Sequence, residues 1–344
     1  MLGRRPRVVL KGLALFTAAA LICGILYEQI GRRQDRRRLP QIGGSVDIGG
    51  RTLNIFCSGS GGPAVIFESA SGIGLEWQSV ETEAAKLTKA CWYDRAGTGW
   101  SDPGPFPRTS AAIARDLHEL LKRAGVPPPY VLAGFSFGGL PLREYGGIYP
   151  NEVAGMILVD SAQEDEPLRA PKFYLAHTAP RFLWRPLDLA FRSAALVGLI
   201  RLTQSSRAQS KNLAQMTHEE IIAALRQQPK SIASSTSTGL VEPESYAQGG
   251  SVRDLGNLPL IVLTAGQPLD FHDPELNRQA AAYQQIWINE MQSKLARLST
   301  RGRQVVLPGC NHGSIPPEAV TTAIHEVVTQ VRSQAGGVSQ VQTR

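Results

Sequence analysis

A serine flanked by glycines lies in the segment VLAGFSFGGL, residues 131–140. Gly134 stands two residues before Ser136, and Gly138 stands two residues after it. The apolar run before the serine predicts a strand, and the residues after it predict a helix. In that setting a G-x-S-x-G segment holds its serine on a sharp turn with the hydroxyl exposed. The spacing therefore predicts Ser136 as a nucleophile, and the backbone N–H of Phe137 at the helix start as an oxyanion donor.

A serine nucleophile needs a base, and the base needs an acid that orients it. His312 follows the strand-like segment RQVVLPG and precedes a helix that begins at a proline, which makes it the expected base. Two residues are candidates for the acid. Asp160 ends the apolar run MILVD, whereas Asp270 follows LIVLTAGQPL. We favour Asp160 because it follows its strand directly, and Asp270 remains the alternative.

Elements that could position these residues alternate along the chain. Strand-like and helix-like segments alternate over residues 45–160 and again over 257–333, which predicts an α/β fold whose mostly parallel sheet has helices on both faces. Residues 161–256 lack strand-like runs and predict a helical lid, inserted after the strand that follows the nucleophile helix. Such a lid would cover the carboxyl edge of the sheet, where open α/β sheets bind ligands. Residues 334–344 are expected to form a flexible tail.

The first 44 residues differ in composition from the rest. Gly12 to Tyr27 carry no charge, and the helix from Val8 to Ile30 could reach across the ~30 Å of a hydrocarbon core. We expect residues 1–31 to be a membrane anchor with its basic flank, and residues 32–44 to be a linker. A cleaved signal peptide is the alternative, although no convincing cleavage site ends the apolar run. Basic residues lie on both sides of this run, so its orientation stays open.

The net charge of +7 is concentrated in the same segment. Between Arg4 and Arg38 there are nine Lys or Arg and two acidic residues, a net of +7 that equals the charge of the whole chain. The rest of the chain is therefore about neutral. This distribution argues against a nucleic-acid partner.

Four segments together resemble the α/β-hydrolase superfamily in its single-domain, lidded form. They are ESASG (68–72), YDRAGTGWSD (93–102), GFSFGG (134–139) and NHG (311–313), and the resemblance covers residues 45–333. It implies a Ser–His–Asp triad that hydrolyses esters, amides or related bonds without a cofactor or a metal. The second oxyanion donor is expected in the loop after AVIFES, at Ala70. Members of the superfamily carry the acid after either strand, so the resemblance does not decide between Asp160 and Asp270.

The chain departs from many relatives in the oxyanion loop, where Glu68-Ser69 replaces His-Gly. We expect Glu68 to be a structural partner of Arg95, and Asp94 to form a structural ion pair. The strand order of the superfamily places Cys57 beside Cys91, as a disulfide or as two buried thiols. A disulfide would place the domain outside the cytoplasm, and this side of the membrane is favoured.

These expectations combine into a membrane-anchored serine hydrolase of the esterase type. Its partners would be a small-molecule ester or acyl substrate and, through the first segment, a membrane; the oligomeric state stays open. A protein of this fold can also bind ligands or signal without catalysis, because fold alone does not set function. The alternative is therefore a non-enzymatic ligand-binding or signalling protein on the same scaffold.

Overall fold

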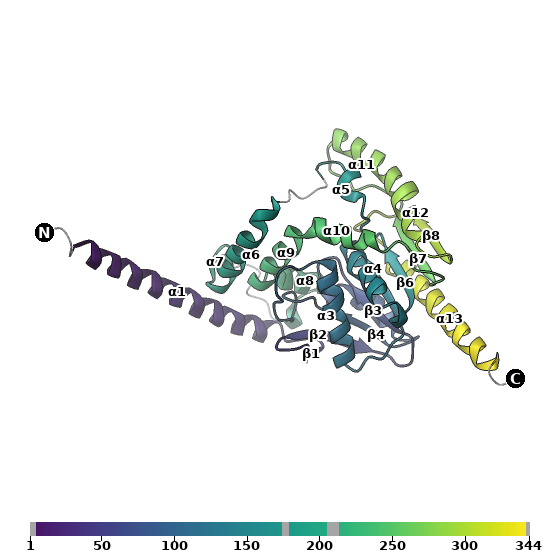
Figure 1. Cartoon of the computed structure of the whole chain (residues 1–344), viewed down its shortest axis with the longest axis horizontal. Helices are drawn as coiled ribbons and strands as arrows, with labels where there is room; N and C mark the ends of the chain where they lie inside the picture. The colour runs from purple at the N-terminus through teal and green to yellow at the C-terminus, as the bar shows by residue number, and fades with distance from the viewer. Residues whose placement is uncertain (1–4, 174–178, 205–212, 342–344) are drawn as a thin grey trace.

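The computed structural model describes residues 5–173, 179–204 and 213–341, and an eight-stranded sheet lies at its centre (Figure 1). The strand order is β1-β2-β4-β3-β5-β6-β7-β8. β2 is antiparallel to both β1 and β4, and all other neighbours are parallel, as predicted. The strands are β1 Gly44–Asp47, β2 Thr52–Ser58, β3 Ala64–Glu68, β4 Ala90–Tyr93, β5 Tyr130–Phe135, β6 Val153–Val159, β7 Leu260–Ala265 and β8 Gly302–Leu307.

Helices cover both faces of the sheet because alternate strand residues point to opposite sides. Val131 and Ala133 of β5 belong to a core cluster shared with α2 and α13, whereas Tyr130 and Leu132 belong to one shared with α3 and α4. The helices are α1 Arg5–Arg38, α2 Gln78–Ala84, α3 Ser110–Arg123, α4 Gly139–Ile148, α5 Glu166–Arg169, α6 Arg181–Leu196, α7 Leu199–Leu202, α8 His218–Arg226, α9 Pro229–Leu240, α10 Glu242–Ser251, α11 Pro274–Ile286, α12 Ser293–Ala296 and α13 Pro317–Val341.

In its described part, the insertion between β6 and β7 consists of helices and the loops that connect them. Its described residues form α5 to α10, together with a short 3-10 turn at Leu213–Gln215. Helix α10 packs against α3 and α4 of the core, and α6 packs against α9 within the insertion. The segment is therefore anchored on the core through α10.

Both ends of the chain are more helical than the sequence predicted. Helix α1 continues to Arg38, through much of the expected linker, because Glu28 pairs with Arg32 one turn later and Asp35 binds Arg201 of α7. Helix α13 likewise continues past the expected start of the tail to Val341. Figure 1 shows the first half of α1 projecting away from the sheet. By length and composition alone, Val9–Arg38 is long and apolar enough to cross a membrane, a test that a signal sequence also passes.

The sheet brings together the two cysteines that the resemblance paired. Cys57 of β2 lies opposite Cys91 of β4, and their sulfur atoms form a disulfide. Cys23 in α1 is exposed and Cys310 is buried, each as a free thiol.

Candidate active site

The glycines around Ser136 are explained by close contacts at the turn. Strand β5 ends directly before Ser136, whose φ of +53° lies in the left-handed region. A Cβ added to Gly138 would lie 2.4 Å from the carbonyl oxygen of Glu68, and one on Gly139 would lie 1.8 Å from Ser161 Oγ. Neighbouring strands therefore approach too closely for side chains at these positions, and the strained turn leaves the serine projecting.

The structure brings Ser136, His312 and Asp160 together. Nε2 of His312 lies 3.0 Å from Ser136 Oγ, and its Nδ1 lies 2.6 Å from Asp160 Oδ2. The Asp160 side chain is 2% exposed, whereas that of His312 is 37% exposed. The second Asp160 oxygen accepts hydrogen bonds from the Ala265 backbone N–H (2.9 Å) and from Trp287 Nε1 (2.8 Å). A carboxylate held in this way favours a proton on Nδ1, which leaves Nε2 free to accept one.

These side chains meet because their strands end at one edge of the sheet. Ser136 and Asp160 directly follow β5 and β6, and His312 follows β8 in a short loop. The carboxyl ends of parallel strands form the ligand-binding edge of open α/β sheets. The Phe135 ring also stacks on the His312 imidazole, with centroids 4.9 Å apart, and limits its rotation.

The second candidate acid lies elsewhere. Asp270 is in an exposed loop, five residues beyond the end of β7, with 64% of its side chain accessible. Its carboxylate accepts hydrogen bonds from the His272 backbone N–H (2.9 Å) and from Asn277 Nδ2 (2.8 Å). These bonds lower the pKa of Asp270, and they tie it to its own loop and to the first turn of α11.

The residue that fixes Asp160 was missed by the sequence reasoning. Trp287 begins a π-helical segment, Trp287–Gln292, that joins α11 to α12. Insertions of this kind are frequent at functional sites. One turn earlier, Gln284 donates a 2.7 Å hydrogen bond to the Ala265 carbonyl. The sequence shows an ordinary helical period here, so only the three-dimensional position of Trp287 reveals its role.

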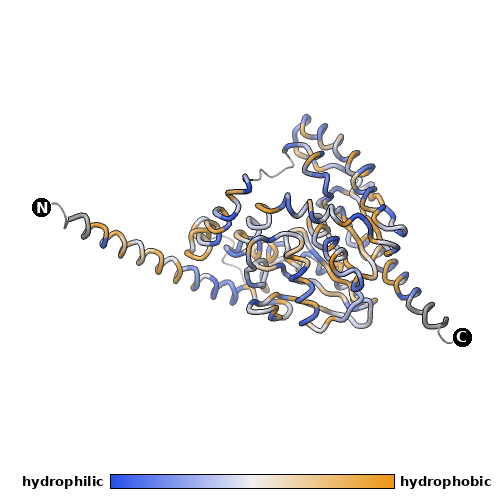
Figure 2. Tube along the Cα trace, viewed as in Figure 1, coloured by the Kyte–Doolittle hydropathy of each residue, from blue (hydrophilic) through white to orange (hydrophobic). Residues whose placement is uncertain are grey.

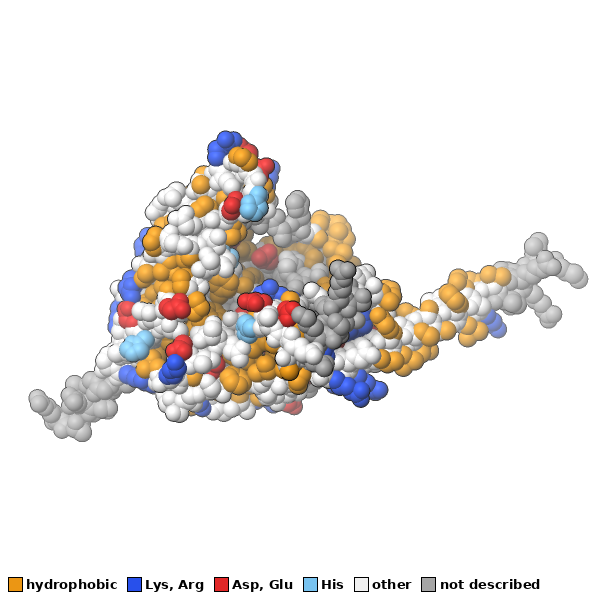
Figure 3. All heavy atoms as spheres, turned by 180° about the vertical axis from the view of Figure 1, so that it is seen from behind, with side chains coloured by type: hydrophobic (Ala, Val, Ile, Leu, Met, Phe, Trp, Pro, Cys, Tyr) orange, Lys and Arg blue, Asp and Glu red, His pale blue; other side chains and the backbone are white. Residues whose placement is uncertain are grey.

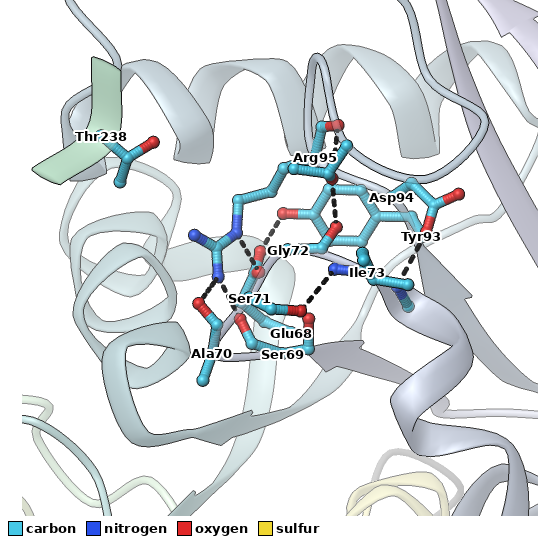
Figure 4. A network of polar contacts seen from close by, with 12 residues as sticks. Glu68, Ser69, Ala70, Ser71, Gly72, Ile73, Tyr93, Asp94, Arg95 and Thr238 are labelled. Atoms are coloured by element: carbon cyan, nitrogen blue, oxygen red, sulfur yellow. Dashed lines mark hydrogen bonds and ion pairs between the residues drawn. The ribbon is translucent and has the colours of Figure 1, made fainter. Parts of the chain in front are cut away.

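The loop that carries Ala70 is held by Arg95 (Figure 4). Nη2 of Arg95 donates to the Ala70 carbonyl at 2.9 Å and to that of Ser69, while Nε donates to Glu68 at 2.7 Å. The guanidinium also lies 5.1 Å from the centroid of the Phe137 ring. The expected pairing of Glu68 with Arg95 is confirmed. Arg95 contacts both segments that were predicted to supply oxyanion donors.

Two buried carboxylates stabilise the loops beneath this site. Burial raises the pKa of Glu68, against the opposing effect of the Arg95 charge. Burial also raises the pKa of Asp94 to about 6, although the N–H groups of Trp100 and Gly74 donate to it. N–H donors satisfy this carboxylate, and the charge of Lys230 also opposes the effect of burial, so the expected ion pair at Asp94 stays a prediction.

Two cavities meet beside Ser136. The larger, of about 400 Å³, is lined by Ser136, His312, Trp287, Glu166, Glu242 and Tyr246, among others. The smaller, of about 260 Å³, is lined by Ala70, Arg95, Thr238 and others, and it shares Phe137 and Glu242 with the first. Phe137 and Glu242 therefore line both spaces.

The insertion supplies acidic groups to the larger cavity. Burial raises the pKa of Glu166 to about 7, although the Tyr246 hydroxyl donates a 3.0 Å hydrogen bond to its carboxylate. Burial also raises the pKa of Glu242. The sequence reasoning missed both residues, because a glutamate at the start of a helix usually serves the helix dipole.

Comparison with known proteins places the fold among hydrolases. The chain is 26% identical over 157 residues to the uncharacterized protein YbdG of Bacillus subtilis, covering 45% of this chain and about half (48%) of that one. A thermophilic esterase from Thermogutta terrifontis covers 85% of this chain and 99% of its own, with a TM-score of 0.55 and 21% identity. The enol-lactonase from Burkholderia xenovorans covers 83% of this chain and 100% of its own, with a TM-score of 0.53 and 15% identity.

At these identities the two solved structures show the fold. The family assignment comes from the sequence itself. Residues 55–328, from β2 to α13, match the sequence pattern of a single family. The chain belongs to the alpha/beta hydrolase family.

Proposed function

We propose that this protein is a membrane-anchored serine hydrolase that cleaves an ester or related acyl bond. One observation carries the proposal: Ser136 Oγ, both imidazole nitrogens of His312 and the Asp160 carboxylate form a continuous hydrogen-bonded series of 3.0 and 2.6 Å. Each group has the chemistry that its position requires. Asp160 is the acid of the proposed triad, and Asp270 has no part in it.

The reaction would proceed in two halves. Ser136 Oγ attacks the carbonyl carbon as His312 Nε2 takes its proton, and the buried Asp160 carboxylate stabilises the imidazolium. The tetrahedral intermediate collapses when His312 returns that proton to the leaving alkoxide. Water then attacks the acyl-enzyme by the same route, with release of the acid and the free serine.

The developing oxyanion would be bound by the backbone N–H groups of Phe137 and Ala70. Phe137 lies in the first turn after the serine, where N–H groups point away from the helix. Ala70 lies in the loop that Arg95 holds through two carbonyl groups. Fixed donors of this type supply much of the rate enhancement in acyl transfer.

The cavities suggest how a substrate would be divided. A carbonyl at the serine turn would place one part of the substrate in the 400 Å³ cavity and the other in the 260 Å³ cavity. The helical insertion would then act as the lid of the site, because its Glu166, Glu242 and Tyr246 line the larger space. Chromogenic esters of increasing acyl length would measure the limit set by that space.

We place the protein in a membrane through the apolar part of α1. The Cys57–Cys91 disulfide supports a catalytic domain on the oxidising, extracytoplasmic side.

The test is labelling by a fluorophosphonate probe, which traps an activated serine. Wild-type protein is expected to be labelled, and Ser136→Ala is expected to lose both labelling and at least about 10³-fold in ester hydrolysis. Ser251→Ala, at an exposed site on α10, is the matched control and should behave as wild type. A wild type that stays unlabelled and hydrolyses no ester would refute the proposal and favour a ligand-binding protein on this scaffold.

A further inference from the structure

The outer side of α6 and α7 exposes large apolar side chains. Phe182 is 78% exposed, Leu189 67% and Leu202 66%, and Leu196 and Leu199 are exposed as well. Phe182, Leu189 and Leu196 recur every seven residues, so they lie along one side of α6. Soluble monomers rarely leave a contiguous apolar surface of this kind without a function for it. We call these five residues the outer face.

An ordinary surface helix exposes its charged side chains and buries its apolar ones, whereas α6 buries its carboxylate and exposes large apolar side chains. Asp188, the one carboxylate of α6, is buried and accepts hydrogen bonds from Arg192 (2.8 Å) and from Ser237. Arg181 and Arg185 are exposed beside the outer face. An apolar face bordered by arginines and free of carboxylates is typical of helices that lie in a lipid interface.

The outer face is continuous with the apolar half of α1. A Cβ on Gly24 would lie 2.4 Å from the Val197 carbonyl oxygen, and one on Gly198 would lie 2.8 Å from the Tyr27 ring, so the two backbones touch. The buried Glu28 then accepts a 2.9 Å hydrogen bond from Arg201 of α7. In Figure 2, α1 changes from hydrophobic to hydrophilic beside α7, and Figure 3 shows apolar side chains along its projecting part.

This contact fixes the depth of α7 relative to α1. From Leu10 to Gly24 the helix rises about 21 Å, at about 1.5 Å per residue. A bilayer that holds the apolar residues of α1 in its ~30 Å core would therefore reach its boundary close to α7. Leu199 and Leu202 would lie at that boundary, where apolar side chains and headgroups mix.

We propose that the outer face of α6 and α7 docks on the lipid bilayer in which α1 is embedded, so that the helical insertion rests on the membrane surface. This inference depends on the anchoring role proposed for α1. We favour a bilayer over a second copy of the chain as the partner of the outer face. The outer face adjoins the apolar part of α1, which is itself proposed to lie in lipid. Arg181 and Arg185 complement anionic headgroups.

The experiment uses single cysteines labelled with an environment-sensitive fluorophore on the full chain, with Cys23 and Cys310 replaced. Leu189→Cys and Leu202→Cys probe the outer face, and Leu15→Cys probes the anchor. Thr329→Cys, on an exposed position of α13, is the control. The proteins are reconstituted in vesicles of phosphatidylcholine and phosphatidylglycerol, with or without nitroxide-labelled lipids. Fluorophosphonate labelling in detergent verifies that each variant is folded.

Quenching by nitroxide lipids at positions 189 and 202, roughly two-fold or more above that at 329, supports the proposal. Quenching at position 15 without quenching at 189 and 202 overturns it and leaves the anchor intact. An unquenched position 15 overturns the anchor and this inference together. The proposal is also overturned if the fluorophores at 189 and 202 are shielded from water, are not quenched by nitroxide lipids, and cross-links form between copies. A second copy of the chain would then cover the outer face.

Discussion

At the scale of single residues, the site depends on how one carboxylate is surrounded. Asp160 is almost completely buried, and its Oδ1 is occupied by two N–H donors while its Oδ2 faces His312. A buried carboxylate without such donors would be costly to ionise. The two donors hold the carboxylate in place, and its Oδ2 orients the His312 imidazole.

Exchange of each candidate acid for its amide separates their roles. Asp160→Asn is expected to lower kcat by about 10⁴-fold, because an amide stabilises the wrong imidazole tautomer. Asp270→Asn should retain kcat within about two-fold, since its carboxylate bonds to its own loop and to the first turn of α11, away from His312. Steady-state kinetics on a chromogenic ester measure both. Equal losses in the two variants would contradict this assignment of the acid.

Glu166 gives the protein a stability that depends on pH. Its folded pKa of about 7 lies above the ordinary value of 4.5, because burial disfavours the charged form. Its contribution to folding is therefore fully present below pH 4.5 and is lost as pH rises through 7. Between pH 5 and 8 the free energy of unfolding should fall by about 1–3 kcal/mol more in wild type than in Glu166→Gln.

Thermal unfolding at several pH values measures this slope. Glu318→Gln, at an exposed position in α13, serves as the control and should follow wild type. Parallel curves for wild type and Glu166→Gln would show that the Glu166 carboxylate does not titrate in this range.

The sequence predicted those site residues that are marked by a local sequence pattern. Ser136 was predicted from its flanking glycines, and His312 from its place after the last strand. The choice between Asp160 and Asp270 stayed open, because both follow strands of the same sheet and only their depth distinguishes them. Trp287 was not predicted because its partner Asp160 lies 127 residues away in the sequence. Glu166 was not predicted because its place in the wall of the cavity has no local sequence pattern.

At the scale of elements, Arg95 joins two loops that come from different strands. It binds the carbonyls of the loop after β3 and lies over the Phe137 ring at the start of the turn before α4. Both loops carry a proposed oxyanion donor. Arg95 is therefore a positioning residue, which acts on the reaction through the backbone that it holds.

Arg95→Met should lower kcat about 10²-fold with little change in KM, because the donors would be misplaced mainly for the transition state. The variant also leaves Glu68 buried without its cation, and we expect a loss of stability. Adding Glu68→Gln should recover the thermal stability but not kcat. Recovery of both would mean that Arg95 is only a structural ion-pair partner.

The elements themselves were predicted more completely than their ends. The strands, their parallel order and the helical character of the insertion followed from the alternation of apolar segments. The end of α1 at Arg38 was not predicted, because its basic residues are typical of a solvated linker. In the structure, Glu28 and Asp35 of this segment form ion pairs with Arg201. Such a contact joins residues more than 160 positions apart and has no local signature.

At the scale of the whole molecule, this same contact joins the apolar helix α1 to the α/β domain. Glu28 and Arg201 are both buried, and Asp35 adds a second carboxylate at 2.8 Å. Removal of one partner from a buried ion pair leaves the other charge buried and unpaired, which is strongly destabilising.

Arg201→Met is expected to destabilise the contact between α1 and α7 by about 3–5 kcal/mol, and Glu28→Gln in the same chain should restore part of that loss. Limited proteolysis in detergent at the Gly24–Arg38 region measures the contact, with fluorophosphonate labelling as evidence of an intact core. Arg185→Met, an exposed arginine of α6, is the control. Unchanged proteolysis in Arg201→Met would contradict the role of this pair.

The distance along the chain between Ser136 and His312 has a consequence for biosynthesis. Their bond spans 176 residues, and the insertion and the three strands β6, β7 and β8 lie between them. A ribosome that has delivered the serine turn must still add β7, the long helix after it and β8 before the imidazole emerges. With the anchor and the triad proposed above, the nascent protein would engage a membrane through α1 long before its active site is complete.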